Sequence, residues 1–596
     1  MKEFLKMMFA TMCGIILLSV LSGIMFMISL IGMIASESGS TKVKDNSVFV
    51  LKMNGSVNER AEDAGAFGAL LGMANMEAMG LDDILASIEK AKDEENIKGI
   101  YLEGGIAEFD SPASAQQIRD ALEDFKESGK WIIAYADNYM QSSYYIASVA
   151  DSIFMNKTGM LELKGLGGKS EYMTGLYEKL GIKYQPVRVG KYKSYVESVT
   201  RKDMSAEDRE QREAYQQGIW QHMLKSIADS RKLQAQQIDQ MVSDSILAFA
   251  NPEDYLKGKL VDKLMYPEGI KEVIKQKLGL GEKDDIRQLT LTDMLNVKSK
   301  KKEKGDKIAV YYAYGEIIDD LTSGFMSEHS IVGNTVVEDL NKLAKDEDVK
   351  AVVLRVNSPG GSAVASEQIW HALKNLKEKK PLVVSMGGVA ASGGYMISSP
   401  ADYIIAEPTT ITGSIGIFGL IPNVSGLVTD KLGVTFDGTK TNRYTDFEEN
   451  LVLAKENSDE LKFMQTYVSR GYDTFLSIVA DGRKLSKEQV HEVAQGRVWL
   501  ATDALPIKLV DKLGSLDDAI KKAAELAKIE GDYYASNYPG KSSWMDNLFP
   551  AEDKSSYLDS ELRTFLGDLY EPVMELRRDQ QRNRLQARLP FNTTMK

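Results

Sequence analysis

Two glycine-rich segments in the second half of the chain carry residue types that acyl-transfer chemistry needs. In the first, "AVVLRV" leads into "NSPGGS", where a tight turn at Gly360 and Gly361 exposes backbone N–H groups able to hold a developing oxyanion. In the second, "PLVVSM" precedes "GGVAASGGYMIS", which places Ser392 between a predicted strand and a predicted helix. Each segment taken singly could be an ordinary turn. Their succession after two predicted parallel strands favours a nucleophilic serine beside amide donors.

A serine hydroxyl is a poor nucleophile until a base takes its proton. The chain has four histidines, which lie singly and outside these motifs: His222, His329, His371 and His491. A lysine can be the base if a dry site lowers its pKa from about 10.4, because burial disfavours the ammonium form. The S-x-x-K spacing does occur at Ser87 and Lys90, but in a stretch typical of an exposed helix turn, so chance explains it. A serine with a lysine base from elsewhere is the arrangement to test.

Length and composition exclude several other classes of protein. The 596 residues exceed one ordinary domain core. With 73 Lys and Arg against 86 Asp and Glu, the net charge of −13 disfavours nucleic acid as a partner. The single cysteine, Cys13, lies in an apolar N-terminal run, so the folded body can have no disulfide, thiolate zinc site or cysteine nucleophile. We expect neither a metal nor a cofactor.

The chain contains an internal duplication with an offset of 251 or 252 residues. The run "IKGIYLEGG" from Ile97 matches "VKAVVLRVN" from Val349, and "ASAQQIRDALEDFKESGKWIIAYA" from Ala113 resembles "VASEQIWHALKNLKEKKPLVVSMG" from Val364. Each half reads as strand, helix, strand, helix, with short β-branched runs separated by stretches of helical spacing. The expected fold class is α/β, with two tandem repeat domains built on parallel sheets.

The N-terminus predicts a membrane anchor, and therefore membrane lipid as a partner. Residues 7–35 are 29 positions without a charge, whereas about 20 residues span the bilayer core as a helix. A cleaved signal peptide is the alternative, but its apolar region usually has about 7–15 residues. Lys2 and Lys6 precede the run, which favours a cytoplasmic N-terminus and a body on the far side. Lys42 and Lys44 beyond the run weaken this charge asymmetry.

Four motifs resemble, in order, those of the signal peptide peptidase A family in its long, duplicated form. They are "VGKYKSYVES" from Val189, "VNSPGGS" from Val356, "AASGGYMIS" from Ala390 and "TGSIGIFG" from Thr412. The likeness covers nearly the whole chain after the N-terminal run. It implies a layered α/β repeat similar to the Clp proteolytic subunit and the crotonases. It also implies a membrane-anchored serine protease with a Ser/Lys dyad, which degrades short apolar peptides such as cleaved signal peptides.

The resemblance assigns roles to particular residues. Ser392 would be the nucleophile and Lys193, from the other half, the general base. Ser414 would orient the lysine. The oxyanion candidates are the backbone amides of Gly360, Gly361 and Gly393.

The duplication supports one composite site. Across the repeat, Ser392 corresponds to Gln141 and Lys193 to Thr445, so each half lacks what the other keeps. The first half also has "GGIAEFD" where the second has the "NSPGG" turn. The sequence departs from the family pattern at Ser198, where a proline is common, and we expect this change to leave the chemistry intact.

These observations divide the chain into five parts. Residues 1–40 form a cytoplasmic stub and anchor, 41–296 the first repeat domain, 297–307 a charged linker, 308–535 the second repeat domain, and 536–596 a C-terminal helical arm. The resemblance further implies a homotetramer in the bacterial inner membrane with its catalytic body in the periplasm. Two other functions stay open: a non-catalytic membrane-anchored scaffold of the same fold, and a crotonase-like acyl-CoA enzyme.

Overall fold

The computed structural model describes residues 40–61, 79–244, 247–300, 304–319, 330–453 and 457–540, together with the backbone of residues 586–588. The expected anchor at residues 7–35 lies outside the described residues, as does most of the expected C-terminal arm. Within the described ranges, no helix combines the length and the apolar character needed to cross a membrane.

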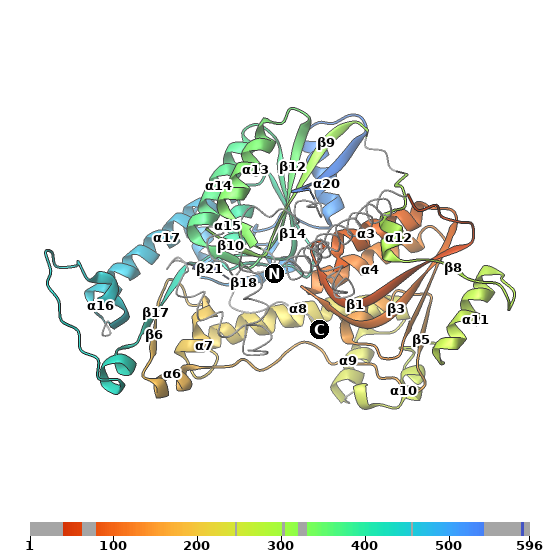
Figure 1. Ribbon diagram of the computed structural model, residues 1–596, viewed down its shortest axis with the longest axis horizontal. Coiled ribbons are helices and arrows are strands. Elements are labelled where there is room, and N and C mark those ends of the chain that lie inside the picture. Colours follow the sequence, from red (N-terminus) through yellow and green to blue (C-terminus); the bar gives the residue numbers. More distant parts are fainter. Residues whose placement is uncertain are drawn as a thin grey trace, which may run out of the picture.

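The first half folds as a parallel sheet with helices on both faces (Figure 1). Its strands, in the order in which they pair, are β2 (Met79–Gly80), β1 (Ser47–Asn58), β3 (Ile97–Phe109), β4 (Trp131–Ala136), β5 (Ser152–Met155) and β7 (Lys263–Leu264), with β8 (Arg287–Leu289) beside β1. The helices α3 (Leu81–Asp93) and α4 (Pro112–Lys126) cover one face and α11 (Pro267–Leu278) covers the other. All these strand pairs are parallel, as the repeated strand–helix pattern predicts.

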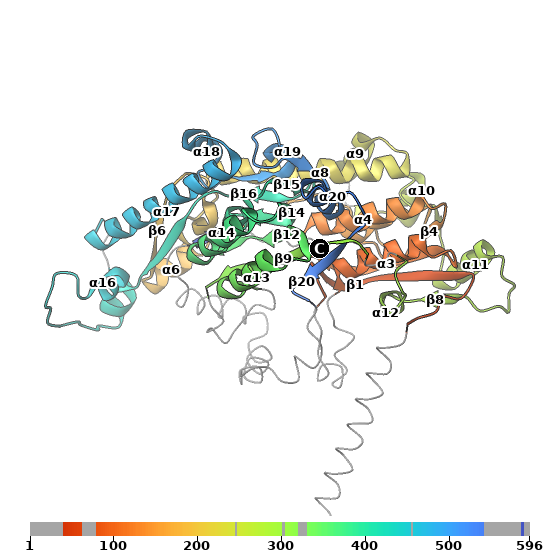
Figure 2. The same cartoon turned by 90° about the horizontal axis from the view of Figure 1, so that it is seen from above.

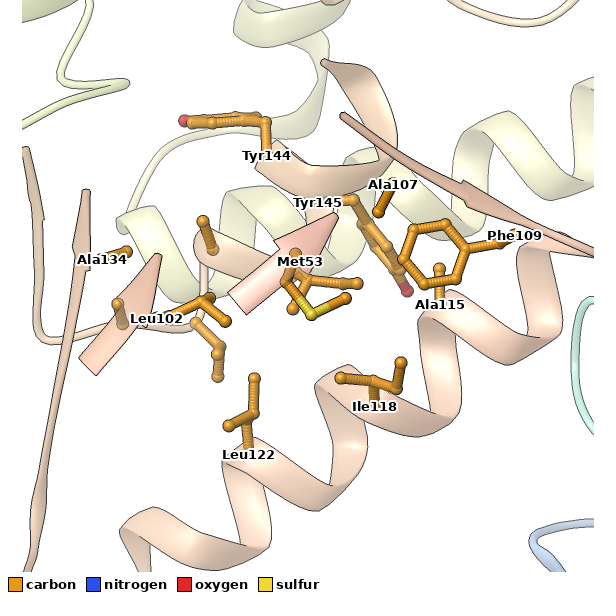
Figure 3. Packing of buried hydrophobic residues seen from close by; sticks show 14 of the residues in the cluster. Met53, Leu102, Ala107, Phe109, Ala115, Ile118, Leu122, Ala134, Tyr144 and Tyr145 are labelled. Carbon is orange, nitrogen blue, oxygen red and sulfur yellow. The ribbon is translucent and has the colours of Figure 1, made fainter. Parts of the chain in front are cut away.

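Alternation along the strands and helical spacing in α4 build the first-half core. Phe49 of β1 faces α3 and α4, whereas its neighbour Val48 faces α11, because successive side chains of a strand point to opposite faces. From α4, Ile118 and Leu122 point toward the sheet (Figure 3). The first five residues of β1 are therefore buried on both faces of the sheet.

The second half repeats this architecture. Its strands pair in the order β18 (Val498–Leu500), β16 (Ile411–Gly413), β14 (Leu382–Ala391), β12 (Val349–Ser358), β9 (Asp306–Tyr314) and β20 (Tyr533–Tyr538), and β15 (Tyr403–Ala406) joins β14 to β19 (Lys512–Leu513). The helices α13 (Gly333–Lys345) and α14 (Ala363–Lys377) pack on one face and α20 (Leu516–Leu526) on the other. Strand β12 begins 252 residues after β3, and β14 begins 251 residues after β4. The duplication seen in the sequence is thus a duplication of structure.

Hydrogen bonds and ion pairs recur at matching positions in the two halves. The hydroxyl of Tyr144 donates to the carbonyl oxygen of Leu260 at 2.8 Å, and that of Tyr395 donates to Leu509 at 2.9 Å. A matched pair of ion pairs links the end of α8 (Ala206–Arg231) to Asp262 and the end of α17 (Asp459–Arg483) to Asp511. The repeat therefore keeps its scaffold contacts even where its motifs have diverged.

A third sheet mixes strands from both halves. In pairing order it contains β11 (Ser330–Val332), β10 (Glu316–Ile318), β13 (Gly360–Ser362), β21 (Gln586–Arg588), β17 (Phe418–Asn423) and β6 (Lys183–Arg188). First-half β6 pairs antiparallel with second-half β17, and the two lie side by side in Figure 1. Since β6 leads directly to Lys193, this pairing brings a first-half loop to the second half.

The two halves also share a hydrophobic core. Val389, Ile411 and Leu500 of the second half belong to the same buried cluster as the first-half strands. Helix α8 of the first half packs against β18, and α4 packs against β14. Figure 2 shows α4 next to the second-half strands. The halves are held together by apolar contact and not only by the segment that connects them.

Two strands extend across the domain boundaries expected from the sequence. Strand β9 begins at Asp306, inside the expected linker, and β20 runs to Tyr538, beyond the expected end of the second domain. In the expected C-terminal helical arm, residues 586–588 form a strand. Residues 536–538 of that arm belong to β20, and its residues 541–585 and 589–596 lie outside the described residues.

The matched tyrosines give a test of the shared scaffold. Tyr144→Phe and Tyr395→Phe should each lower the free energy of unfolding by about 1–3 kcal/mol, because each leaves a buried carbonyl without its donor. Chemical denaturation of the two variants measures the effect, and Tyr467→Phe, at a side chain that is 44% exposed, is the control. A large loss in only one of the two buried variants would contradict an equivalent role in both halves.

Candidate active site

Ser392 sits on a sharp turn between a buried strand and a helix. Every residue of β14 is buried, and α15 (Gly393–Ser398) begins directly after Ser392. The backbone of Ser392 has φ 56° and ψ −115°, a region that side chains with a Cβ rarely adopt. Its N–H donates to the carbonyl oxygen of Gly413 at 2.8 Å, which holds the turn closed. A strained turn of this kind aims a serine hydroxyl away from its own backbone.

Lys193 reaches the same place from a loop of the first half. The loop runs from β6 to the short helix η2 (Ser194–Val196), and the side chain of Lys193 is fully buried. The Arg188 guanidinium donates to the carbonyl oxygen of Lys193 at 2.7 Å. The Gln211 side-chain amide donates to the carbonyl oxygen of Tyr192 at 3.2 Å and accepts from the N–H of Val498 at 3.1 Å. These bonds fix the lysine loop against both its own helix α8 and the second half.

The lysine amine meets two serine hydroxyls. Lys193 Nζ lies 2.8 Å from Ser392 Oγ and 3.0 Å from Ser414 Oγ, and it donates to the carbonyl oxygen of Ser414 at 3.2 Å. All three side chains are fully buried. Ser414 also has a positive φ, of 50°, and its N–H donates to the carbonyl oxygen of Arg497 at 2.7 Å. The structure therefore brings together three residues that the sequence motifs singled out.

The electrostatics of this cluster are those of a neutral amine. Burial lowers the pKa of the Lys193 ammonium well below its ordinary value, and among the described residues no carboxylate acts against that effect. Small and apolar groups surround the side chain: a Cβ at Gly496 would lie 2.6 Å from Lys193 Cβ, and the Phe418 ring centroid is 6.0 Å from Nζ. A buried lysine without a counter-ion favours the unprotonated form, which is the form able to accept a proton.

The glycine turn lies beside Ser392, as the sequence predicts. A Cβ at Gly393 would be 3.3 Å from the Cα of Gly360, so the turn and the start of α15 are in close contact. The N–H of Gly360 donates to Ser358 Oγ at 3.2 Å, and that hydroxyl donates to the carbonyl oxygen of Gly315 at 2.6 Å. Gly361 pairs with Ile317 of β10. The N–H of Gly393 belongs to the first turn of α15, where no intrahelical acceptor exists.

The counterpart positions of the repeat lie elsewhere. Gln141 begins α5 (Gln141–Ala147), and its side-chain oxygen accepts from the N–H groups of Lys164 and Gly165 at 3.0 and 2.9 Å. Thr445 lies in an exposed turn and bonds Asn442. Neither contacts the Lys193 cluster, so the described residues hold one Ser/Lys pair of this kind.

Sequence reasoning missed two residues that support the site, Gln211 at the lysine loop and Ser358 at the glycine turn. Gln211 lies inside α8, and nothing in its local pattern marks it. Ser358 is part of the "NSPGG" motif, and its place before the two glycines is the signal that could have identified it. Among the described residues, no group of three or more His, Cys, Asp or Glu side chains is arranged to hold a metal ion.

Comparison with known proteins identifies the family. The model of peptidase family S49 matches the chain twice, at residues 124–281 and 374–530. The chain belongs to peptidase family S49. The Clp protease family model matches residues 323–408 of the same S49 chain. The two S49 matches confirm the duplicated α/β architecture, and the resemblance to signal peptide peptidase A is confirmed by the relatives described next.

The relatives of this S49 peptidase cover most of its length. Protease 4 of Haemophilus influenzae is 35% identical over 88% of this chain and 86% of its own. Protease 4 of Salmonella typhi is 37% identical over 81% of this chain and 79% of its own, and the chloroplastic serine protease SPPA of Arabidopsis thaliana is 27% identical over 82% and 70%. The protein is a serine protease that acts on peptides, which decides against the scaffold and acyl-CoA alternatives.

The burial of Lys193 makes the stability of the folded protein depend on pH. In the folded protein the pKa of Lys193 is lowered, whereas in the unfolded chain it returns to about 10.4. The unfolded state therefore binds more protons in the interval between the two pKa values, and stability rises with pH across it. Lys193→Met should raise the free energy of unfolding at neutral pH, and its advantage over wild type should shrink as the pH approaches 10.

Denaturant titrations from pH 7 to pH 10 measure this difference. Lys191→Met, in the same loop at an exposed position, is the matched control and should show no such trend. An advantage of Lys193→Met that stays constant or grows with pH would mean that Lys193 is not buried in its neutral form.

Proposed function

We propose that this serine protease uses Ser392 as its nucleophile and Lys193 as its general base. The observation that carries the proposal is the 2.8 Å contact between Lys193 Nζ and Ser392 Oγ inside a buried cluster. The distance is within the hydrogen-bond reach that proton transfer requires. Ser414 accepts a hydrogen bond from Nζ, which aims the lone pair of the amine at Ser392.

In the acylation step, neutral Lys193 takes the proton of Ser392 as Oγ attacks the carbonyl carbon of the scissile peptide bond. The resulting ammonium then gives this proton to the leaving amine, and the C–N bond breaks to leave an acyl-enzyme. In the second step Lys193 takes a proton from water, which attacks the ester and releases the acid. The protonated lysine returns its proton to Ser392 Oγ, which restores the starting state.

The oxyanion of the tetrahedral intermediate needs donors beside Ser392. We assign the N–H of Gly393, the residue that follows the nucleophile, as the principal donor, with Gly361 in the neighbouring turn as the second. The N–H of Gly360 bonds Ser358, so we assign it to holding the turn in shape. Because these donors are backbone groups fixed by packing, they need no reorganisation as the charge develops.

The substrates we propose are short apolar peptides, such as cleaved signal peptides. A relative from Enterococcus faecium, 35% identical over 40% of this chain and 71% of its own, carries the name putative signal peptide peptidase SppA. The edge of β13 can accept an extended peptide: β21 pairs antiparallel with it, and Arg588 faces Gly360 in that register. A peptide in the same position would lie beside the glycine turn next to Ser392.

We further propose that residues 1–40 anchor the protein in the bacterial inner membrane, with the catalytic body in the periplasm. The support is the charge-free run of 29 residues at positions 7–35, preceded by Lys2 and Lys6. An anchor of this kind would hold the active site near apolar peptides that are released into the bilayer.

The proposed quaternary structure is a homotetramer. Strands β6 and β17 each have a counterpart in the other half of the duplication. Residues 434–439 correspond to β6 and residues 167–172 to β17, and both segments form no strand and are largely exposed. Two large apolar side chains of the first region are exposed, Val434 by 43% and Phe436 by 61%, and Leu432 just before it is exposed by 66%. A head-to-tail contact between 434–439 of one copy and 167–172 of the next would cover them and could close a ring.

The dyad predicts a non-additive pattern of variants. Ser392→Ala, Lys193→Ala and the double variant should each lose most of the activity and resemble one another, because residues that act as a unit are non-additive. Lys193→Arg should be equally inactive, since a guanidinium stays protonated. Turnover of a small apolar peptide ester measures the effect, and Lys191→Arg in the same loop is the matched control. A Lys193→Ala enzyme near the wild-type rate would refute the cross-half dyad even if Ser392 proved essential.

The anchor and the tetramer can be tested with one truncation. The full chain should remain in the membrane pellet after alkaline extraction, whereas the chain without residues 1–40 should be soluble, active and tetrameric by light scattering. Phe436→Asp in the truncated chain should lower that mass. Retention of the truncated chain in the pellet would count against the anchor, and a monomeric truncated chain would count against the tetramer.

A further inference from the structure

A second buried polar cluster lies at the junction of the two halves, outside the Lys193 site. Its centre is an ion pair in which Arg355 Nε of β12 donates to Glu59 Oε1 of the first half at 2.6 Å, and the two side chains are 1% and 3% exposed. The same guanidinium donates to Ser385 Oγ and to Gln117 Oε1, each at 3.0 Å. This set of bonds alone would satisfy the arginine and tie the halves together.

Asn357 extends the cluster toward the active site. Its side-chain Nδ2 donates to Glu59 Oε2 at 3.1 Å and to Asp110 Oδ2 at 2.6 Å. Its Oδ1 accepts from the N–H of Val389 at 3.1 Å. Because ionised carboxylates only accept hydrogen bonds, the two acidic residues fix which end of the amide faces them and which end faces Val389.

The position of Asn357 connects the two strands that form the active site. Val356 of β12 pairs with Met386 of β14, but Ser358 pairs with Ala390, so residues 387–389 of β14 bulge opposite Asn357. The side-chain oxygen of Asn357 holds the last residue of this bulge. Gly360 lies three residues after Asn357, and Ser392 lies three residues after Val389. One amide therefore sets the ends of both strands.

The carboxylate of Asp110 is not needed for an ion pair that only joins the two halves. Burial and, to a smaller extent, the charge of Glu59 raise the pKa of Asp110 to about 6, although hydrogen bonds from Ser114 and Asn357 and the charge of Arg355 act in the opposite direction. Placing two carboxylates beside one guanidinium is costly in a buried site. The first half, which has Gln141 where the second has Ser392, has Gly105 where the second has Asn357. The asparagine is thus found in the half that holds the nucleophile.

We propose that Asn357 is a positioning residue for peptide hydrolysis, held in place by Glu59 and Asp110 of the first half so that its amide aligns the glycine turn with Ser392. The proposal rests on the assignment of Ser392 as the nucleophile. Through this residue the first half contributes to the site twice, once by supplying Lys193 and once by fixing the geometry of the oxyanion donors.

The test uses substitutions that exchange hydrogen-bond donors and acceptors but keep the size of each side chain. Asn357→Asp in the full chain puts a third carboxylate against Glu59 and Asp110, and should lower kcat by about 100-fold while KM changes by less than about threefold. The affinity for a peptide aldehyde, which forms a tetrahedral adduct with the serine, should fall in parallel with kcat/KM. The triple variant Glu59→Gln, Asp110→Asn, Asn357→Asp reverses the polarity of both bonds and should return kcat to within about tenfold of wild type.

The matched control is Thr409→Val, which removes the bond from Thr409 Oγ1 to Gln116 Oε1 (3.0 Å) across the same junction without touching Asn357, and should leave kcat nearly unchanged. A folded triple variant that stays as inactive as Asn357→Asp would overturn the proposal, as would aldehyde affinity that is unchanged in Asn357→Asp. Ser392→Ala in the same assay separates the two assignments: if it stays active, the nucleophile assignment fails regardless of the result at Asn357.

Discussion

The structure depends on one constraint, a buried lysine amine that has no counter-ion in the described part of the chain. A carboxylate near Lys193 would stabilise the ammonium and remove its basicity, whereas an exposed position would let water do the same. The protein avoids both, because Gly416, Gly496 and Phe418 surround the side chain. Its polar partners are uncharged: the hydroxyls of Ser392 and Ser414 and the carbonyl oxygen of Ser414. Such a site can be dry only if rigid elements close around it on all sides.

Those elements come from two halves that cannot be separated without opening the site. The lysine loop is held by α8 and by β6, and β6 pairs with a second-half strand. The two halves also share one hydrophobic cluster. Apolar burial in this cluster holds the halves together, and this association keeps water away from Lys193. Across the repeat, Ser392 corresponds to Gln141 and Lys193 to Thr445, whereas the matched hydrogen bonds of Tyr144 and Tyr395 show that both halves keep part of the same framework.

A cluster of buried polar contacts lies beside the glycine turn of the candidate active site. It contains Arg355, Glu59, Asp110 and Asn357, whose bonds lie between 2.6 and 3.1 Å. Directional bonds set angles that apolar packing leaves free, and the strained backbone of Ser392 needs such support to persist.

The sequence by itself determined the elements and the motifs. Local patterns carry this information: β-branched runs and helical spacing specified the repeated parallel units, and glycines beside Ser392 and at positions 360 and 361 marked the turns, because turn geometry is a local property of the backbone. Family resemblance, and not spacing, was needed to select Lys193 from the many lysines of the chain. Only the tertiary structure shows that Lys193 and Ser392, which are 199 residues apart in the sequence, lie 2.8 Å from each other. It also decided that Gln211 holds the loop of Lys193 and that Glu59 and Asp110 bond Asn357, since long-range hydrogen bonds depend on which surfaces meet and leave no periodic pattern in the sequence.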